Sequence, residues 1–152
     1  QSAGIHTALD TCGFVPKENI LQVLPYADRV LFSLKGSTDA AYQQLTKARS
    51  MKLILENLQL IAERKPVTVR YVFIPDYTDG PECLAALIRI MNGLPATAEV
   101  EILPYHTLGR GKWKELGWEY LLDGVPEPAP EQLQAFRQQL QQAGIRLAAT
   151  EQ

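Results

Sequence analysis

The sequence predicts an α/β fold, a partial (β/α) barrel in which about four main βα units form a parallel half-barrel. Strand-like and helix-like segments alternate along the chain, and repeated units of this kind imply a parallel sheet with right-handed crossovers. The strand-like segments are near-continuous apolar runs, as expected for strands buried on both faces. They read GIHTALDT, RVLFSLK, VTVRYVFIPD and VEILPYH.

The elements follow one another with few interruptions. Strands are expected at about 4–9, 29–34, 67–74 and 98–103, and helices at about 16–25, 39–48, 51–64, 81–92 and 130–143. Pro16 and Pro130 fit the first turns of their helices, where the missing N–H has no helical partner to lose. Thr38 offers an N-cap, and Gly93 ends its helix. The residues GIRLAA near the C-terminus suggest a short final strand.

Four strands of this type cannot close a barrel alone. The first strand would be an apolar, unpaired edge, which soluble proteins usually avoid. The chain also enters this strand almost at its first residue. We therefore expect residues 1–152 to be one part of a longer barrel domain.

A long irregular stretch is expected between the last two elements, at residues 105–130. Loops longer than about 12–15 residues are usually functional or disordered. This one contains both tryptophans, which favours an ordered segment. Trp113 and Trp118 either form a small core that pins the loop or face a partner protein, because aromatic residues are favoured interface anchors.

Size and composition exclude several classes of protein. At 152 residues and 17.0 kDa the length fits one domain, and the net charge is −2. The absence of a basic stripe argues against nucleic acid as a partner, and no apolar run approaches the roughly 18 residues that span a membrane. Cys12 and Cys83 have no metal-like spacing, and two lone thiols suit a reducing cytoplasm.

Polar side chains gather at or near the C-terminal ends of the expected strands. In barrels and open α/β sheets the chemistry takes place at this edge, so these residues are expected to surround one site. The residues are Asp10, Thr11, Ser33, Lys35, Arg70 and His106.

Each of these residues also has a purely structural interpretation. Asp10 and Thr11 suit a turn with a helix cap. Lys35 suits a solvated strand end, and Arg70 a structural ion pair, since an unpaired buried arginine is rare. His106 suits a hydrogen-bonded structural histidine.

Five segments resemble one family in order and with sensible gaps: GIHTALDTCGF, ADRVLFSLK, VTVRYVFIPDYTD, EVEILPYHTLGRGKW and EYLLDGVPEP. The most specific is the LPYH segment followed by LG and a KW pair. Together they resemble the glycyl-radical-enzyme activating proteins of the radical S-adenosylmethionine superfamily, and most closely those that activate pyruvate formate-lyase.

The resemblance implies a partial (β/α)6 barrel and a reaction. A [4Fe–4S] cluster, held by three cysteines in a CxxxCxxC loop, binds S-adenosylmethionine at its open iron. Reductive cleavage, with electrons from a flavodoxin or ferredoxin-type protein, gives a radical that removes a hydrogen atom from a glycine of a glycyl radical enzyme such as pyruvate formate-lyase. The family's first two βα units carry that loop and a Gly-Gly-Glu motif, and this chain has neither motif. It therefore resembles the C-terminal two-thirds of an activase, which alone is expected to be inactive.

The resemblance also implies roles for individual residues. It places Asp10 and Thr11 beside S-adenosylmethionine, with a weak monovalent cation site at the same pair. Lys35 would pair with the methionine carboxylate. Arg70 would line the mouth near the bound peptide, and His106 would face both cofactor and peptide.

One residue departs from the family pattern, because this chain reads SLK where the family usually reads DLK. Ser33 removes a carboxylate from the expected cation site. Two other functions stay open at this point. A degenerate paralogue would be a non-catalytic binding module for a glycyl radical enzyme, and an unrelated aldolase-like barrel would use Lys35 as a Schiff-base lysine.

Overall fold

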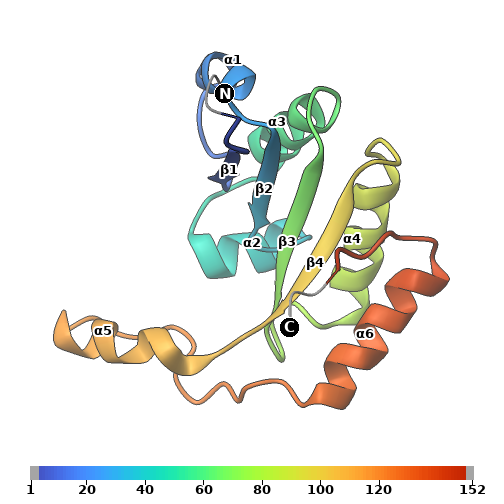
Figure 1. The fold of residues 1–152 in the computed structure, drawn as a ribbon. Coiled ribbons are helices and arrows are strands. Elements are labelled where there is room, and N and C mark those ends of the chain that lie inside the picture. The colour runs from blue at the N-terminus through green and yellow to red at the C-terminus, as the bar shows by residue number, and fades with distance from the viewer. Residues whose placement is uncertain (1–3, 150–152) are drawn as a thin grey trace.

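A computed structural model describes residues 4–149, and these form one parallel sheet with the order β1-β2-β3-β4 (Figure 1). The strands are β1 (Ala8–Thr11), β2 (Arg29–Leu34), β3 (Val67–Phe73) and β4 (Glu99–Pro104). Every neighbouring pair is parallel, so all four strands end at the same edge. The predicted α/β fold with a parallel sheet is confirmed, and the first strand lies later than the 4–9 expected from the sequence.

Helices connect the strands and continue beyond the last one. They are α1 (Lys17–Val23), η1 (Leu24–Tyr26), α2 (Asp39–Thr46), α3 (Lys52–Ala62), α4 (Pro81–Asn92), η2 (Thr107–Gly109), α5 (Arg110–Glu115) and α6 (Pro130–Gln142). The Thr38 side chain accepts the Ala41 N–H at 3.2 Å and caps α2 as predicted. None of the described helices is both long enough and apolar enough to cross a bilayer.

The two faces of the sheet differ, which corrects the prediction of strands buried on both faces. Side chains such as Phe32, Val69 and Tyr71 point into the core, where they meet apolar residues of α1, α3, α4 and α6. The ring of Phe136 on α6 is stacked on the Tyr71 ring, with 6.2 Å between the ring centroids. It packs edge-on against the Phe73 ring, with 5.2 Å between the centroids. The alternating positions on the strands are polar or partly exposed, because they face away from this core.

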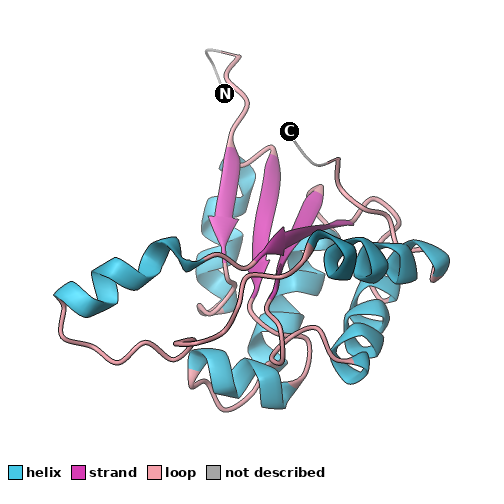
Figure 2. Ribbon diagram, turned by 90° about the horizontal axis from the view of Figure 1, so that it is seen from below, coloured by secondary structure: helices cyan, strands magenta, loops and turns pink. Residues whose placement is uncertain are grey.

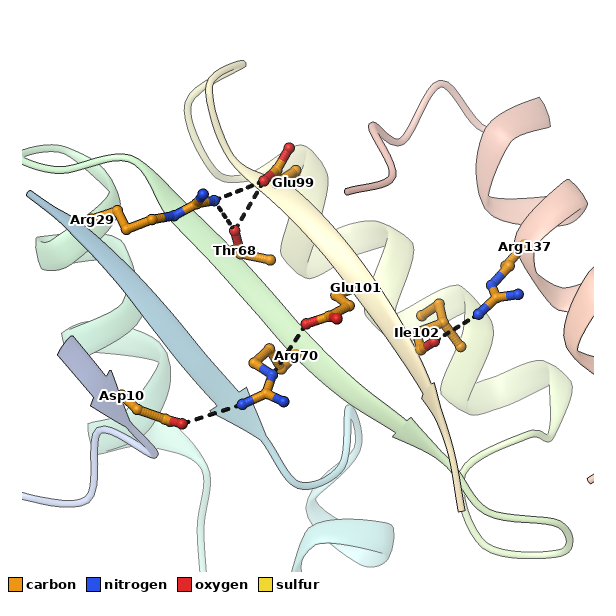
Figure 3. A network of polar contacts seen from close by, with 8 residues as sticks. All are labelled: Asp10, Arg29, Thr68, Arg70, Glu99, Glu101, Ile102 and Arg137. Carbon is orange, nitrogen blue, oxygen red and sulfur yellow. Dashed lines mark hydrogen bonds and ion pairs between the residues drawn. The ribbon is translucent and has the colours of Figure 1, made fainter. Parts of the chain in front are cut away.

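The two edges of the sheet also differ. At β4, the Val100 N–H donates to the Arg146 carbonyl and the Ala148 N–H donates to the Val100 carbonyl, both at 2.9 Å. Arg137 of α6 donates to the Ile102 carbonyl of the same strand at 2.9 Å (Figure 3). The predicted final strand is therefore a single parallel bridge between Leu147 and Val100. Among the residues that the structure describes, β1 pairs with β2 alone.

The segment expected to be an irregular loop contains η2 and α5, which corrects that prediction. We call residues 107–127 the arm, because they extend away from the body of the molecule (Figures 1 and 2). Glu127 closes its base by accepting the Thr107 N–H at 3.0 Å and the Thr107 hydroxyl at 3.1 Å. Arg110 forms an ion pair with Asp123 across the arm. These local contacts make the segment regular although it has little apolar core of its own.

The stacking position of Phe136 predicts a large loss of stability when its ring is removed. The side chain is 3% exposed, so Phe136→Ala should destabilise the chain by about 3–5 kcal/mol in a urea titration. Phe14→Ala is the matched control, since that ring is 56% exposed and its loss should change stability by about 0.5 kcal/mol or less. Equal losses in the two variants would contradict the assigned core.

Candidate functional site

A cavity of about 620 Å³ lies at the C-terminal ends of the central strands. Its volume is within the range of about 300–1,000 Å³ usual for small-molecule sites. The wall is mainly apolar, with a few polar groups from separate strands. Its lining includes Lys35, Arg70, Val72, Leu103, Tyr105, His106 and Leu122. Three of the residues predicted to form a site, Lys35, Arg70 and His106, therefore share one cavity.

Arg70 is held between two carboxylates on the open face of the sheet (Figure 3). Its Nε donates to Glu101 Oε2 on β4 at 3.1 Å, and its Nη1 donates to Asp10 Oδ2 on β1 at 3.2 Å. The guanidinium therefore connects three of the four strands. Two nearby carboxylates offset the single positive charge of Arg70. Arg70 therefore forms structural ion pairs, as one interpretation of the sequence expected, and it also lines the cavity.

Asp10 and Thr11 lie next to each other on β1 but make different contacts. Neighbouring residues on a strand point to opposite faces, and Asp10 faces Arg70. The Thr11 hydroxyl instead accepts the Gly13 N–H at 3.0 Å, which is a turn contact. The structure thus brings Asp10 to the cavity through Arg70, whereas Thr11, the last residue of β1, contacts the turn that follows.

The loop after β1 is fixed by a close approach to the core. Gly13 has φ +71°, and a Cβ there would lie 2.5 Å from the Phe32 ring. The buried Asn57 amide of α3 donates to the Gly13 and Val15 carbonyls, both at 2.8 Å. These contacts hold the end of β1, and therefore Asp10, in position. Asn57 was not identified from the sequence, because a polar residue within an apolar helix gives no sign of its partners.

Lys35 and His106 contribute the remaining polar groups of the cavity. Among the described residues the Lys35 side chain makes no hydrogen bond or ion pair, so no carboxylate is paired with its charge. His106 precedes η2 at the base of the arm, with its backbone extended at φ −141° and ψ 154°. The described lining of the cavity therefore contains one compensated cation, Arg70, and one uncompensated cation, Lys35. This arrangement suits a ligand with a carboxylate.

A buried polar cluster fixes the turn after β3, which includes the cavity-lining Ile74. The Thr78 hydroxyl accepts the Ile74 N–H at 2.7 Å and the Tyr71 hydroxyl donates to the Thr78 carbonyl at 3.0 Å, so the turn after β3 is fixed. Ser37 lies 3.0 Å from the Tyr71 hydroxyl and donates to the Cys83 carbonyl at 2.7 Å. Burial raises the pKa of Tyr71 far above the ordinary tyrosine value, which keeps this phenol protonated.

A second polar row lies at the opposite, N-terminal ends of the strands (Figure 3). Arg29 of β2 donates to Glu99 at 2.9 Å and to Thr68 at 2.6 Å, and Thr68 donates to the same Glu99 oxygen at 2.9 Å. This row crosses three strands but is remote from the cavity. It explains why the open face carries charge along its whole length.

The described residues do not fit an iron–sulfur cluster. Cys12 is exposed and Cys83 is a buried residue of α4, and two separated thiols cannot supply three ligands. No group of three or more His, Cys, Asp or Glu side chains within residues 4–149 could hold a metal ion. The cavity combines cationic side chains with a mainly apolar wall, which suits a ligand such as S-adenosylmethionine that carries a carboxylate and a flat adenine ring.

Comparison with known proteins identifies the family. The family model of the radical SAM superfamily matches residues 1–88. The chain belongs to the radical SAM superfamily. This confirms the superfamily expected from the sequence, whereas the individual roles of Asp10, Thr11, Lys35, Arg70 and His106 stay predictions.

Curated relatives narrow the similarity to activating enzymes. The chain is 33% identical over 139 residues to a pyruvate formate-lyase-activating enzyme of Listeria monocytogenes, covering 86% of this chain and 55% of the relative. It is 34% identical over 143 residues to a pyruvate formate-lyase 1-activating enzyme of Escherichia coli, and the match covers 93% of this chain and 58% of that relative. A choline trimethylamine-lyase activating enzyme of Oleidesulfovibrio alaskensis is 34% identical over 127 residues, covering 81% and 41%. The chain thus spans little more than half the length of the first two relatives.

Solved structures confirm the fold. A domain of a pyruvate-formate lyase-activating enzyme from Bacteroides vulgatus superposes with a TM-score of 0.78 at 24% identity, covering 99% of this chain and 84% of that one. A radical SAM methyltransferase from Sphaerobacter thermophilus gives a TM-score of 0.69 at 17% identity, covering 94% and 39%. The parallel α/β architecture is therefore that of radical SAM proteins.

The contact at the base of the arm predicts a pH-dependent opening. The Thr107 N–H, followed by its hydroxyl, lowers the pKa of Glu127 below the ordinary glutamate value. Because the pKa of Glu127 is lowered in the folded arm, the contact stabilises the arm fully at a pH above the ordinary glutamate pKa. This stabilisation is lost as the pH falls through the lowered pKa. We expect faster exchange of the Thr107 amide hydrogen in acid, beyond the intrinsic pH effect, measured by NMR. Glu127→Gln should remove the acid dependence, and a dependence that persists would contradict this assignment.

Proposed function

We propose that this chain is the C-terminal part of a glycyl-radical-enzyme activase, with residues 1–152 forming part of a radical SAM partial barrel. The cavity would bind S-adenosylmethionine and the glycine-containing segment of a partner such as pyruvate formate-lyase. The observation that carries the proposal is the shared cavity of Lys35, Arg70 and His106, in a chain similar to activating enzymes. The site would act in a cytoplasmic protein.

The chain's own residues would bind and orient the reactants. Lys35, the uncompensated cation, would hold the methionine carboxylate by a charge-assisted hydrogen bond. Arg70, fixed by Asp10 and Glu101, would line the mouth near the peptide. His106, which follows β4 and lines the same cavity, would face both the cofactor and the peptide. S-adenosylmethionine, when bound and reductively cleaved in the complete protein, supplies the radical that removes the glycine hydrogen.

The cluster would lie outside this chain. The described cysteines do not fit it, so the proposal assigns its ligands to βα units that precede β1 in the complete protein. The free edge of β1 supports this arrangement, since another parallel strand could pair there. Exposed apolar residues near that edge, Ile5, Phe14 and Tyr26, would then be covered. A flavodoxin or ferredoxin-type protein would be the reductant.

Cofactor binding by Lys35 can be tested directly. The test protein is this chain joined to the cluster-binding units of the Listeria monocytogenes relative and reconstituted without oxygen. In calorimetric titration with S-adenosylmethionine, Lys35→Ala should weaken binding by about 1.5–3 kcal/mol, because a charge-assisted hydrogen bond is lost. Lys52→Ala is the matched control, since Lys52 is largely exposed on α3 and pairs with Glu56 at 3.9 Å.

The same protein separates an activase from a binding module. An activase should generate a glycyl radical on pyruvate formate-lyase, detected by electron paramagnetic resonance. A protein that binds the partner without forming the radical would instead support the degenerate, non-catalytic paralogue. Unchanged affinity of the Lys35→Ala variant for the cofactor would remove Lys35 from the site.

The departure at Ser33 gives an independent prediction. The register places Ser33 on β2 directly beside Arg70 on β3, so Ser33→Asp would add a third carboxylate to the pair that already holds Arg70. The excess negative charge should make S-adenosylmethionine binding to the joined protein stronger and more dependent on sodium or potassium, because hard cations prefer oxygen ligands. Calorimetry in these salts and in a large inert cation measures the effect. Ser33→Asn, which adds no charge, should show none, and indifference of Ser33→Asp to the cation would contradict a cation site here.

A further inference from the structure

Four aromatic side chains lead from the wall of the cavity to the exposed part of the arm. Tyr105, which lines the cavity and is 6% exposed, shares a hydrogen bond of 2.8 Å between hydroxyl oxygens with Tyr120. The Tyr120 ring lies 5.8 Å from the Trp113 ring, and Trp113 lies 5.8 Å from Trp118. Trp113 and Trp118 are 39% and 61% exposed.

We propose that Tyr105, Tyr120, Trp113 and Trp118 form a one-electron relay that carries oxidising equivalents from the cavity to solvent. Tyrosine and tryptophan side chains form relatively stable neutral radicals by losing one electron and one proton. Adjacent members of this chain touch through a hydrogen bond or neighbouring rings, so each step is short. The relay rests on the proposed function only for its oxidant. This oxidant is a carbon-centred radical in the cavity that has not removed a hydrogen atom from the glycine of the partner.

The steps balance as hydrogen-atom and electron transfers. The carbon radical takes the hydroxyl hydrogen atom of Tyr105, so a C–H bond forms and an O–H bond breaks. Tyr120 then passes its hydroxyl hydrogen atom across the 2.8 Å hydrogen bond, which restores Tyr105 and leaves a phenoxyl radical on Tyr120. Trp113 gives Tyr120 an electron, and the indole proton follows through solvent. Trp118 restores Trp113 in the same way, and a thiol in solution restores Trp118 and is oxidised to a thiyl radical.

The environment of the tyrosine pair favours hydrogen-atom transfer. Burial, with the Tyr120 hydroxyl next in effect, raises the pKa of Tyr105 to about 12, so the phenol keeps its hydrogen at neutral pH. The first step is downhill because an alkyl C–H bond is stronger than a phenolic O–H bond. The exposed end is Trp118, which follows α5 in the arm and is 61% exposed, so a small reductant has access to it. The arm therefore gives an unspent radical an exit away from the sheet.

The relay can be tested in the 152-residue chain without cofactor or cluster, by running it from the exposed end. A photo-excited ruthenium tris-bipyridine complex with a sacrificial electron acceptor oxidises exposed tryptophan. Tyr26→Phe is used as the background, since Tyr26 is 74% exposed and would react directly. Transient absorption should show an indolyl radical that decays into a tyrosyl radical, and freeze-quenched samples should show the tyrosyl signal by electron paramagnetic resonance.

Tyr120→Phe keeps the ring beside Trp113 but removes the shared hydroxyl, so tyrosyl formation should be lost and the indolyl radical should persist. Tyr77→Phe is the matched control, because Tyr77 is partly exposed in the turn after β3 and lies outside the relay, so this change should alter neither signal. The proposal is supported if the indolyl radical converts into a tyrosyl radical in the Tyr26→Phe background, and if Tyr120→Phe blocks this conversion while Tyr77→Phe does not. It is overturned if the background protein shows no conversion, or if the conversion survives Tyr120→Phe. Because neither outcome involves S-adenosylmethionine, failure of the relay is distinguishable from failure of the proposed activase.

Discussion

The guanidinium of Arg70 is the charge on which the arrangement of the site depends. It reaches from the third strand to Glu101 on the fourth and Asp10 on the first, and so joins the end of the sheet into one unit. Arg70 is 30% exposed and Asp10 58%, so each pair contributes little stability by itself. The main effect is on position and charge. By offsetting Arg70, the two carboxylates leave Lys35 as the cation that can attract a ligand carboxylate.

The alternation of the strands explains why charge gathers on one face. Every second side chain enters the core, and the remaining positions carry the Arg70 row at one end and the Arg29 row at the other. The Arg29 row has its polar groups joined to one another across three strands. The Arg70 row lies beside the cavity, where an uncompensated cation remains. The same alternating pattern therefore yields a structural row at the strand beginnings and a site at the strand ends.

Sequence reasoning recovered the strands well, because a buried parallel strand is a short apolar run with clear ends. It placed the second strand at residues 29–34, where the structure has Arg29–Leu34. It misjudged how deeply the strands are buried, since one Arg within an apolar run does not show which carboxylates it will meet. Arg70 pairs with Glu101 on the neighbouring strand. The sequence shows that Glu101 alternates with the apolar Ile102, but it does not show which residue of another strand lies beside Glu101. The arm was expected to be ordered, but its helices η2 and α5 were not predicted, because the contacts that fix it are local pairs such as Thr107 with Glu127 and not an apolar repeat.

The unequal edges of the sheet determine where further structure can be added. At β4 the backbone groups of Val100 are occupied by the segment that follows α6, and Arg137 occupies the Ile102 carbonyl. A new strand there would have to displace both contacts. At β1 the described residues offer no such barrier, and apolar side chains are exposed nearby. Since a parallel strand needs a crossover connection, a complete βα unit suits this edge better than an isolated strand. Growth of the sheet from β1 would also enclose Asp10 and Arg70, which turns an open polar face into the interior of a barrel and strengthens its charge interactions as water leaves.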